Sequence, residues 1–379
     1  MRVVMTLKVR DEEDILADNL RFHLAQGVDF FVVTDNGSTD STGEILEGYE
    51  RAGLAEVTRE PSADLHDRGH EWVTKMARAA ATEHGADWVV LGDADEFWWP
   101  LEGTLRDVLA AVPDEYGALI AARTEFVARP PGPGHWSERL LVRERRALLR
   151  PKVAHRGNPN AIVLHRGGHD VAFVEEGQTL RSALRPPGRP VLRGVREEEG
   201  GGGGEPVPMP TFDVRILHFP VRSLEQFQRR VDAALLHDPG RGPRARLKER
   251  YESEGIEGVY AELDLDDAAV EEGIAAGRLV RDTRLRDFLA QCPNPLPPAA
   301  SSAQQPEPPT LPAAELERER AELRRDAMEA LARHARLVEA RLDRDRQLAR
   351  EIVEVKAEKR KATQQARRRR ERIRRLQRK

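Results

Sequence analysis

Cysteine and long apolar runs are nearly missing from this sequence of 379 residues. The one cysteine, Cys292, cannot form an intramolecular disulfide or a zinc site built from several thiolates. No apolar run approaches the roughly 20 residues that span a bilayer. The apolar run near Met1 is too short and too closely bounded by charge for a signal peptide. We therefore expect a protein of a reducing compartment, most simply the cytoplasm.

Charge is abundant but unevenly distributed. The chain has 61 basic and 65 acidic residues, for a net charge of −4. Residues 313–379 carry a net charge of +10, so residues 1–312 carry −14. An acidic body is not typical of nucleic-acid-binding proteins. We therefore expect no specific nucleic-acid partner, and any affinity for polyanions belongs to the tail.

Strand and helix patterns alternate through the first hundred residues. Short apolar, β-branched runs over 3–9, 30–34, 54–58 and 87–91 predict strands. The segments between them have the spacing and end signals of helices, which predicts a parallel, doubly wound sheet covered on both faces. From 116 to 173 the pattern becomes mixed and antiparallel. The predicted fold class is therefore α/β with a doubly wound mixed sheet.

The composition divides the chain into successive parts. Residues 1–115 and 116–292 form the two halves of the α/β domain, and the second half includes an exposed, mobile loop over 181–211 with five successive glycines. Residues 293–312 are proline-rich, which predicts a semi-rigid linker. Residues 313–379 follow as one long amphipathic helix.

The tail favours self-association. Its apolar residues recur at three- and four-residue steps, and a long helix without a partner is marginal in water, so we expect a coiled coil and a homo-oligomer. The end of the tail, 356–379, holds 13 basic and 2 acidic residues. This end is either a solvated charged helix or a contact for a polyanion such as an anionic membrane. The second alternative would place the protein peripherally at the inner face of a membrane.

Two aspartates stand directly after the last strand of the first half. Asp93 and Asp95 are separated by one residue, so in an extended segment both carboxylates can face the same way. Mn²⁺ and Mg²⁺ take few carboxylates and complete their shells with phosphate oxygens. The pair therefore predicts a site for Mn²⁺ or Mg²⁺ bound to a nucleotide diphosphate, and the alternative is two solvated aspartates that cap a turn.

Other strand ends supply further candidates for the same crevice, because ligands of such sheets bind beyond the carboxyl ends of the strands. His218 ends a late strand and is a candidate metal or phosphate ligand, with a core histidine as the alternative. Asp35 and Asn36 follow the second strand, and Arg10 and Asp11 follow the first. These four are candidate nucleotide-binding residues, although helix capping and turn formation explain them nearly as well.

A dense polar patch lies in the second half of the domain. It contains His155, Arg156, Asn158 and His169, and its histidine spacing fits no compact zinc motif. We expect this patch to bind the acceptor or a phosphate, while a loop-rich hairpin would have a similar composition.

At these residues the chain resembles glycosyltransferase family 2-like proteins of the GT-A fold, in the subgroup that carries DADEF. Four ordered blocks carry the resemblance: TLKVRDEEDILADNLRFHLAQGVDFFVVTDNGSTDST, GADWVVLGDADEFWWP, KVAHRGNPNAIVLHRGGHDV and ILHFPVRSLEQFQRRV. The resemblance implies transfer of a sugar from a nucleotide diphosphate-sugar to a glycan, lipid-linked or protein acceptor, aided by Mn²⁺ or Mg²⁺. It makes residues 1–115 the nucleotide-sugar-binding half and 116–292 the acceptor half.

The resemblance also assigns roles to individual residues. Asp35 would contact the nucleoside, Asp93 and Asp95 would hold the metal and diphosphate, and His218 would join them. An inverting enzyme also needs a carboxylate that deprotonates the acceptor hydroxyl. No pair of acidic residues after Asp95 clearly matches the family's base, and Glu125 and Asp170 are the candidates.

Two other functions compete with this one. A GT-A scaffold that has lost catalysis could act as a binding or assembly module through its coiled coil, and the missing base motif favours that alternative. Nucleotidyl transfer uses a similar metal-carboxylate site, but the N-terminal region lacks a glycine-rich, lysine-containing phosphate loop.

Overall fold

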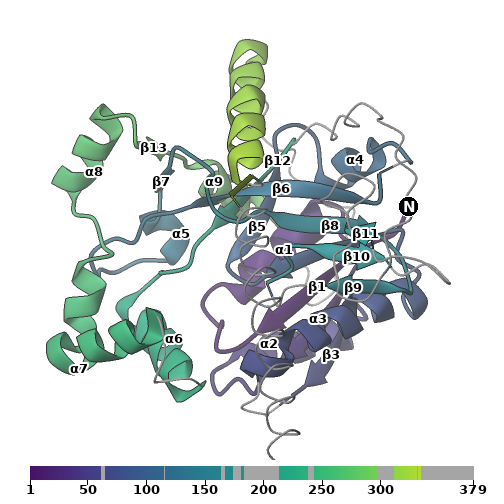
Figure 1. Cartoon of the computed structure of the whole chain (residues 1–379), viewed down its shortest axis with the longest axis horizontal. Helices are drawn as coiled ribbons and strands as arrows, with labels where there is room; N and C mark the ends of the chain where they lie inside the picture. Colours follow the sequence, from purple (N-terminus) through teal and green to yellow (C-terminus); the bar gives the residue numbers. More distant parts are fainter. Residues whose placement is uncertain are drawn as a thin grey trace, which may run out of the picture. The chain divides into compact units, whose positions relative to one another are not determined.

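A mixed sheet of eight strands runs through the part of the chain that the computed structural model describes (Figure 1). The described residues are 1–60, 65–114, 116–163, 167–173, 181–182, 213–237, 243–294, 296, 311–330 and 332–333. In sheet order, the strands are β3 Ala55–Arg59, β2 Phe30–Asp35, β1 Val3–Val9, β4 Trp88–Asp93, β8 Lys152–Arg156, β6 Ala118–Glu125, β12 Val214–His218 and β5 Glu96–Pro100.

The strand directions bring many strand ends to one edge of this sheet. Strands β3, β2, β1 and β4 are mutually parallel, and β8 runs antiparallel between β4 and β6. Strand β12 is parallel to β6, and β5 is antiparallel to β12. The carboxyl ends of β1, β2, β4, β6 and β12 therefore share an edge with the amino ends of β8 and β5. The predicted α/β class with a mixed sheet is confirmed.

Helices cover both faces of the sheet, as the alternating pattern predicts. Helix α3, Leu65–Thr82, packs on one face, where Val4 of β1 and Val89 of β4 are buried against Met76. The other face holds a larger core that includes α1, Leu16–Ala25, and α9, Arg284–Gln291. Strand β1 is apolar on both faces because helices cover both.

One strand of the sheet escaped prediction from the sequence. Strand β5 begins at Glu96, directly after the aspartate pair, and pairs with β12. Its Trp98 and Trp99 are buried, at 0% and 2% exposed, and Trp99 packs against Phe22 and Phe288. These aromatic side chains belong to the core.

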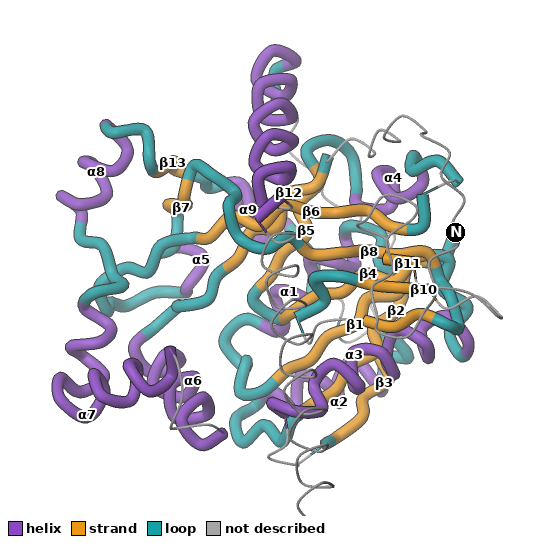
Figure 2. Tube along the Cα trace, viewed as in Figure 1, coloured by secondary structure: helices purple, strands orange, loops and turns teal. Residues whose placement is uncertain are grey.

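The remaining elements are short or lie beside the main sheet (Figure 2). Two small sheets pair β9 Ala161–Val163, β10 Val171–Phe173 and β11 Arg181–Ser182, and β7 Val142–Glu144 with β13 Leu279–Arg281. The other helices are α2 Thr42–Arg51, α4 Leu105–Ala110, α5 Trp136–Arg139, α6 Leu224–His237, α7 Pro243–Ala261 and α8 Asp267–Ala275.

A further helix over 313–330 belongs to the same compact unit, Met1–Ala330, as the sheet. Its Leu316, Leu323 and Ala327 are at most 7% exposed. Its Glu319 forms ion pairs with Arg215 of β12 and with Arg284. The first part of the predicted tail therefore packs against the α/β body.

Several sequence-based predictions fall on other parts of the chain. Most of the predicted loop over 181–211 and of the linker over 293–312 lies outside the described residues, as does the tail beyond 333. The coiled coil therefore stays a prediction. Within the described residues, no helix combines the length and apolarity needed to cross a membrane.

Candidate functional site

The ends of β1 and β2 are tied together by backbone and side-chain hydrogen bonds. Asn36 donates its backbone N–H to the carbonyl of Val9, at 2.9 Å. The Asp11 carboxylate accepts from the backbone N–H of Thr39 at 2.7 Å, and Asp11 has a φ of 53°, in the left-handed region. Asp35 accepts from the Ser38 hydroxyl at 2.7 Å and is 5% exposed. The structure thus brings the predicted nucleotide-binding residues of both strands together, with Arg10 paired to Asp11 at 3.7 Å.

Asp95, His218 and Glu125 meet at the same edge of the sheet. His218 pairs in register with Glu125 of β6 on one side and with Glu96 of β5 on the other. Its Nε2 lies 3.5 Å from Asp95 Oδ2, and its Nδ1 lies 3.4 Å from Glu125 Oε2. The side chains of Asp95 and His218 are about nine-tenths buried, while that of Glu125 is 37% exposed. The imidazole therefore links a buried carboxylate to a more accessible one.

The charged forms of Asp95 and His218 stabilise each other. Burial opposes protonation of His218, but the nearby carboxylates of Asp95 and Glu125 outweigh burial and raise the pKa of His218 to about 9. Burial also opposes ionisation of Asp95, yet His218, Arg230 and Arg222 hold the pKa of Asp95 well below its usual range. Asp95 is thus a carboxylate neutralised by protein cations.

Asp93 has a different partner, a buried lysine that the sequence analysis missed. Lys152 Nζ lies 2.7 Å from Asp93 Oδ2 and 2.8 Å from Glu96 Oε2, and the Lys152 side chain is 1% exposed. Arg123 holds the second oxygen of Glu96 at 2.9 Å. Burial opposes charge on both Lys152 and Asp93, but their mutual attraction raises the pKa of Lys152 and lowers that of Asp93. The two aspartates of the motif therefore occupy different environments.

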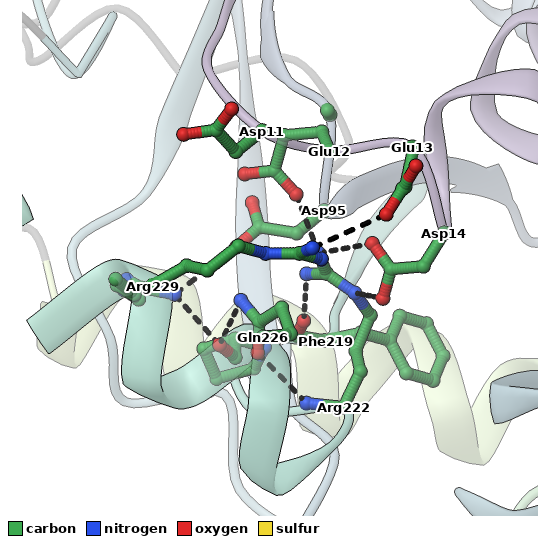
Figure 3. Close-up of polar contacts among 12 residues, drawn as sticks. Asp11, Glu12, Glu13, Asp14, Asp95, Phe219, Arg222, Gln226 and Arg229 are labelled. Carbon is green, nitrogen blue, oxygen red and sulfur yellow. Dashed lines mark hydrogen bonds and ion pairs between the residues drawn. The ribbon is translucent and has the colours of Figure 1, made fainter. Parts of the chain in front are cut away.

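A second ionic group fixes the loop after β1 against α6 (Figure 3). Arg222 is fully buried, donates to the Phe219 carbonyl at 3.0 Å and pairs with both Glu12 and Asp14. Burial raises the pKa of Glu12 to about 7, against the attraction of Arg222. Arg229 of α6 pairs with Glu13 at 3.1 Å. The acidic run 11–14 and the basic residues of α6 were visible in the sequence, but only the fold shows that they meet.

Two residues of the predicted acceptor patch, His155 and Arg156, lie at the other end of the sheet. Because β8 is antiparallel to β4, His155 and Arg156 lie opposite Val89 and Trp88, at the start of β4. Arg156 stacks over the Trp88 ring at 4.9 Å and donates to backbone carbonyls. His155 is fully buried, which lowers its pKa to about 4. The structure does not bring these two residues to the aspartates.

The other members of the patch and the second candidate base are placed separately. Asn158 follows β8 beyond Arg156, and its side chain accepts from the Asn160 backbone. His169 Nδ1 lies 2.8 Å from the Pro151 carbonyl, and Asp170 is buried beside it, at 9% exposed. Of the two candidate bases, Glu125 is the one that the described contacts join to His218.

Asp95 and His218 are the described side chains that could hold a divalent cation, once the imidazole has given up its proton. Ligand atoms of an octahedral Mg²⁺ or Mn²⁺ ion lie about 2.1 Å from the ion and hence roughly 3 Å from each other. Asp95 Oδ2 and His218 Nε2 lie 3.5 Å apart, close to this spacing. No group of three or more His, Cys, Asp or Glu side chains able to hold a metal occurs among the described residues. Two protein ligands would leave the other positions to phosphate oxygens and water.

The fold and this edge define a class: a mixed α/β domain with acidic and basic side chains gathered where parallel strands end. Residues 4–143 match the model of glycosyltransferase family 92, and this span contains the aspartate pair and Glu125. The match supports a glycosyltransferase. The finer resemblance to family 2 and its DADEF subgroup stays a prediction.

The solved structures that resemble this chain do so at low sequence identity and low TM-score. S. aureus TarS 1–349 is 15% identical over 77% of this chain and 87% of that chain, with a TM-score of 0.28. The TarS 1–349 complex with UDP-GlcNAc is 20% identical over 35% of this chain and 36% of that chain, with a TM-score of 0.24. The chain covers 23% of the longer TarS structure. No curated protein matches the sequence.

Proposed function

We propose that this protein is a divalent-cation-dependent glycosyltransferase that uses a nucleotide diphosphate-sugar. One observation carries the proposal: Asp95 and His218, whose facing atoms lie 3.5 Å apart, share a sheet edge with Asp35 and Asn36. The match of residues 4–143 to a glycosyltransferase family supports the same chemistry.

The residues at this edge have complementary roles in the proposal. Asp95 and His218 would hold Mn²⁺ or Mg²⁺, which neutralises charge on the departing diphosphate when bound. Asp93, kept ionised by Lys152, would face the ribose or the diphosphate. Asp35 and the segment around it would contact the nucleoside.

Glu125 is the proposed general base. Its carboxylate is 37% exposed, so an acceptor hydroxyl can reach it, and it stands on the strand next to His218. In direct displacement, the acceptor oxygen attacks the sugar carbon and its proton passes to Glu125. The bond to the diphosphate breaks with its electron pair on the phosphate oxygen, and the configuration inverts. Glu96 is unsuited to this role because it is buried and held by Lys152 and Arg123.

A thermal-unfolding panel tests the binding half of the proposal. UDP, GDP, dTDP and CDP are each added with and without Mn²⁺, since a ligand that binds only the folded state raises the melting temperature. We expect one nucleotide to act only with Mn²⁺, and Asp95→Asn to abolish its effect. Asp87→Asn, at the other end of β4, is the matched control and should behave as the wild type. A shift that persists in Asp95→Asn would contradict the proposed metal site.

A specific observation favours one alternative, a scaffold that binds nucleotide without catalysis. Both aspartates are already neutralised by protein cations, Asp93 by Lys152 and Asp95 by His218. In that alternative the ion pairs would serve the fold rather than a metal. It predicts nucleotide binding that needs no Mn²⁺ and no release of nucleoside diphosphate from any donor.

We further propose that the tail mediates self-association and peripheral contact with anionic membranes. Because the helix over 313–330 packs within the α/β unit, a deletion that tests the tail should begin after residue 333. Sedimentation and liposome binding unchanged by this deletion would contradict both roles.

A further inference from the structure

Arg230 of α6 occupies an unusual position beside the proposed metal site. Its Nη1 donates to the Pro220 carbonyl at 2.7 Å and lies 3.5 Å from Asp95 Oδ2. The same oxygen lies 3.5 Å from His218 Nε2. Two protein cations therefore share the carboxylate oxygen that a metal ion would take.

Arg230 is more exposed to solvent than Arg222 and Arg123, two other arginines at this edge. Arg222 is fully buried between Glu12 and Asp14, and Arg123 holds Glu96 at 2.9 Å with its side chain 16% exposed. The Arg230 side chain is 51% exposed, and its described hydrogen bonds all use Nη1. Its Nε and Nη2 can therefore donate to a ligand that arrives from solvent.

We propose that Arg230 exchanges partners during donor binding, which rests on the proposed function. In the free protein it neutralises Asp95, and in the donor complex it contacts the diphosphate. A dication held by Asp95 and His218 in place of the His218 proton would repel the guanidinium, while the diphosphate would bring negative charge to the same place. A guanidinium suits this second role because its planar fork donates two parallel hydrogen bonds to phosphate oxygens.

The exchange also matters for the chemical step. When the bond between the sugar carbon and the diphosphate oxygen breaks, the electron pair stays on that oxygen. The acceptor oxygen forms the new bond, and its proton goes to Glu125. A guanidinium at the diphosphate stabilises the added charge more in the transition state than in the bound donor.

Opposite changes in two binding constants test the exchange. Calorimetric titration measures MnCl₂ alone, and then UDP, GDP, dTDP and CDP in turn at saturating Mn²⁺. Arg230→Gln should bind Mn²⁺ roughly fivefold more tightly, because a competing charge is gone. It should bind the nucleoside diphosphate roughly tenfold or more weakly, because a charge-assisted hydrogen bond is lost.

Two further variants serve as controls. Arg250→Gln removes the same charge from the neighbouring helix α7, where Arg250 pairs with Glu254 and Glu262, and should match the wild type. Arg230→Lys keeps the charge without the fork, so its Mn²⁺ affinity should stay near that of the wild type while nucleotide affinity recovers in part.

The outcomes separate this inference from the proposed function. Nucleotide affinity of Arg230→Gln within twofold of the wild type would overturn the exchange and leave the proposed function standing. Weaker binding of both Mn²⁺ and nucleotide would also overturn it, since Arg230 would then only support the site's structure. Failure of the wild type to bind any of the four nucleotides with Mn²⁺ would overturn the proposed function and the exchange together.

Discussion

Glu319 connects the helix over 313–330 to the strand that ends at His218. Its carboxylate lies 3.2 Å from Nε of Arg215 and 3.1 Å from Nη2 of Arg284. Arg215 is 1% exposed, and its Nη1 donates to Thr124 at 2.7 Å, next to the proposed base on β6. Burial, reinforced by a neighbouring arginine, lowers the pKa of Arg215 to about 10. Glu319 therefore compensates a charge that has no access to water.

Substitution Glu319→Gln should destabilise the protein strongly. Removing one partner of a buried ion pair costs about 3–5 kcal/mol. We expect the lower end, about 3 kcal/mol, because Asp282 still pairs with Arg284 at 2.6 Å. Urea unfolding followed by the fluorescence of the buried Trp98 and Trp99 measures the loss.

The loss should depend on pH with a defined sign. Arg284 and Arg215 lower the pKa of Glu319 in the folded protein below its ordinary value of 4.5, against the effect of burial. The stabilisation is therefore fully present above about pH 4.5 and disappears as the pH falls through the folded pKa. The difference between wild type and variant should be constant from about pH 7 to pH 5 and shrink below that range.

Glu317→Gln provides the control on the same helix. Glu317 is 70% exposed and pairs with Arg320 one turn away, so its loss should cost at most about 1 kcal/mol. Equal effects of the two substitutions, or a difference for Glu319→Gln that grows below pH 5, would refute the reasoning.

Three other substitutions give separate outcomes. Lys152→Met should lower the free energy of unfolding by roughly 3 kcal/mol or more in urea titrations, because the buried Glu96 loses a cationic partner. A loss below about 1 kcal/mol would contradict the ionic role of Lys152. Glu125→Gln should reduce nucleoside diphosphate release at least about a hundredfold while nucleotide affinity is kept, as expected for a general base; unchanged turnover would exclude Glu125. Arg156→Gln should leave nucleotide affinity unchanged in calorimetry and lower only the melting temperature, because Arg156 lies at the start of β4; weaker nucleotide binding would restore it to the site.

The sequence predicts the first part of the fold, residues 1–115, well. Apolar, β-branched runs determine β1, β2 and β4, because strands covered on both faces must be apolar on both. Parallel strands then bring their carboxyl ends together, which places Asp35 near Asp93. The motif residues could be found because their position at a strand end is itself visible in the sequence.

The remaining features of the fold and the site depend on contacts between segments that are far apart in the sequence. Lys152 meets Asp93 across 59 residues, and nothing local to either indicates the pairing. The patch prediction grouped His155, Arg156, Asn158 and His169 because they lie close together in the sequence. Strand β8 is antiparallel and extended, so His155 and Arg156 are carried away from the edge where the strand begins. The packing of the 313–330 helix likewise depends on buried ion pairs, such as that of Glu319 with Arg215, which amphipathic spacing does not reveal.

Release of nucleoside diphosphate from a sugar donor tests the central claim most directly. Wild type and Asp95→Asn are incubated with the sugar donors of UDP, GDP, dTDP and CDP, with Mn²⁺ and with EDTA. The proposed function predicts release from one donor class that requires Mn²⁺ and collapses in Asp95→Asn. Tight nucleotide binding with no release from any donor would contradict it and favour the non-catalytic scaffold.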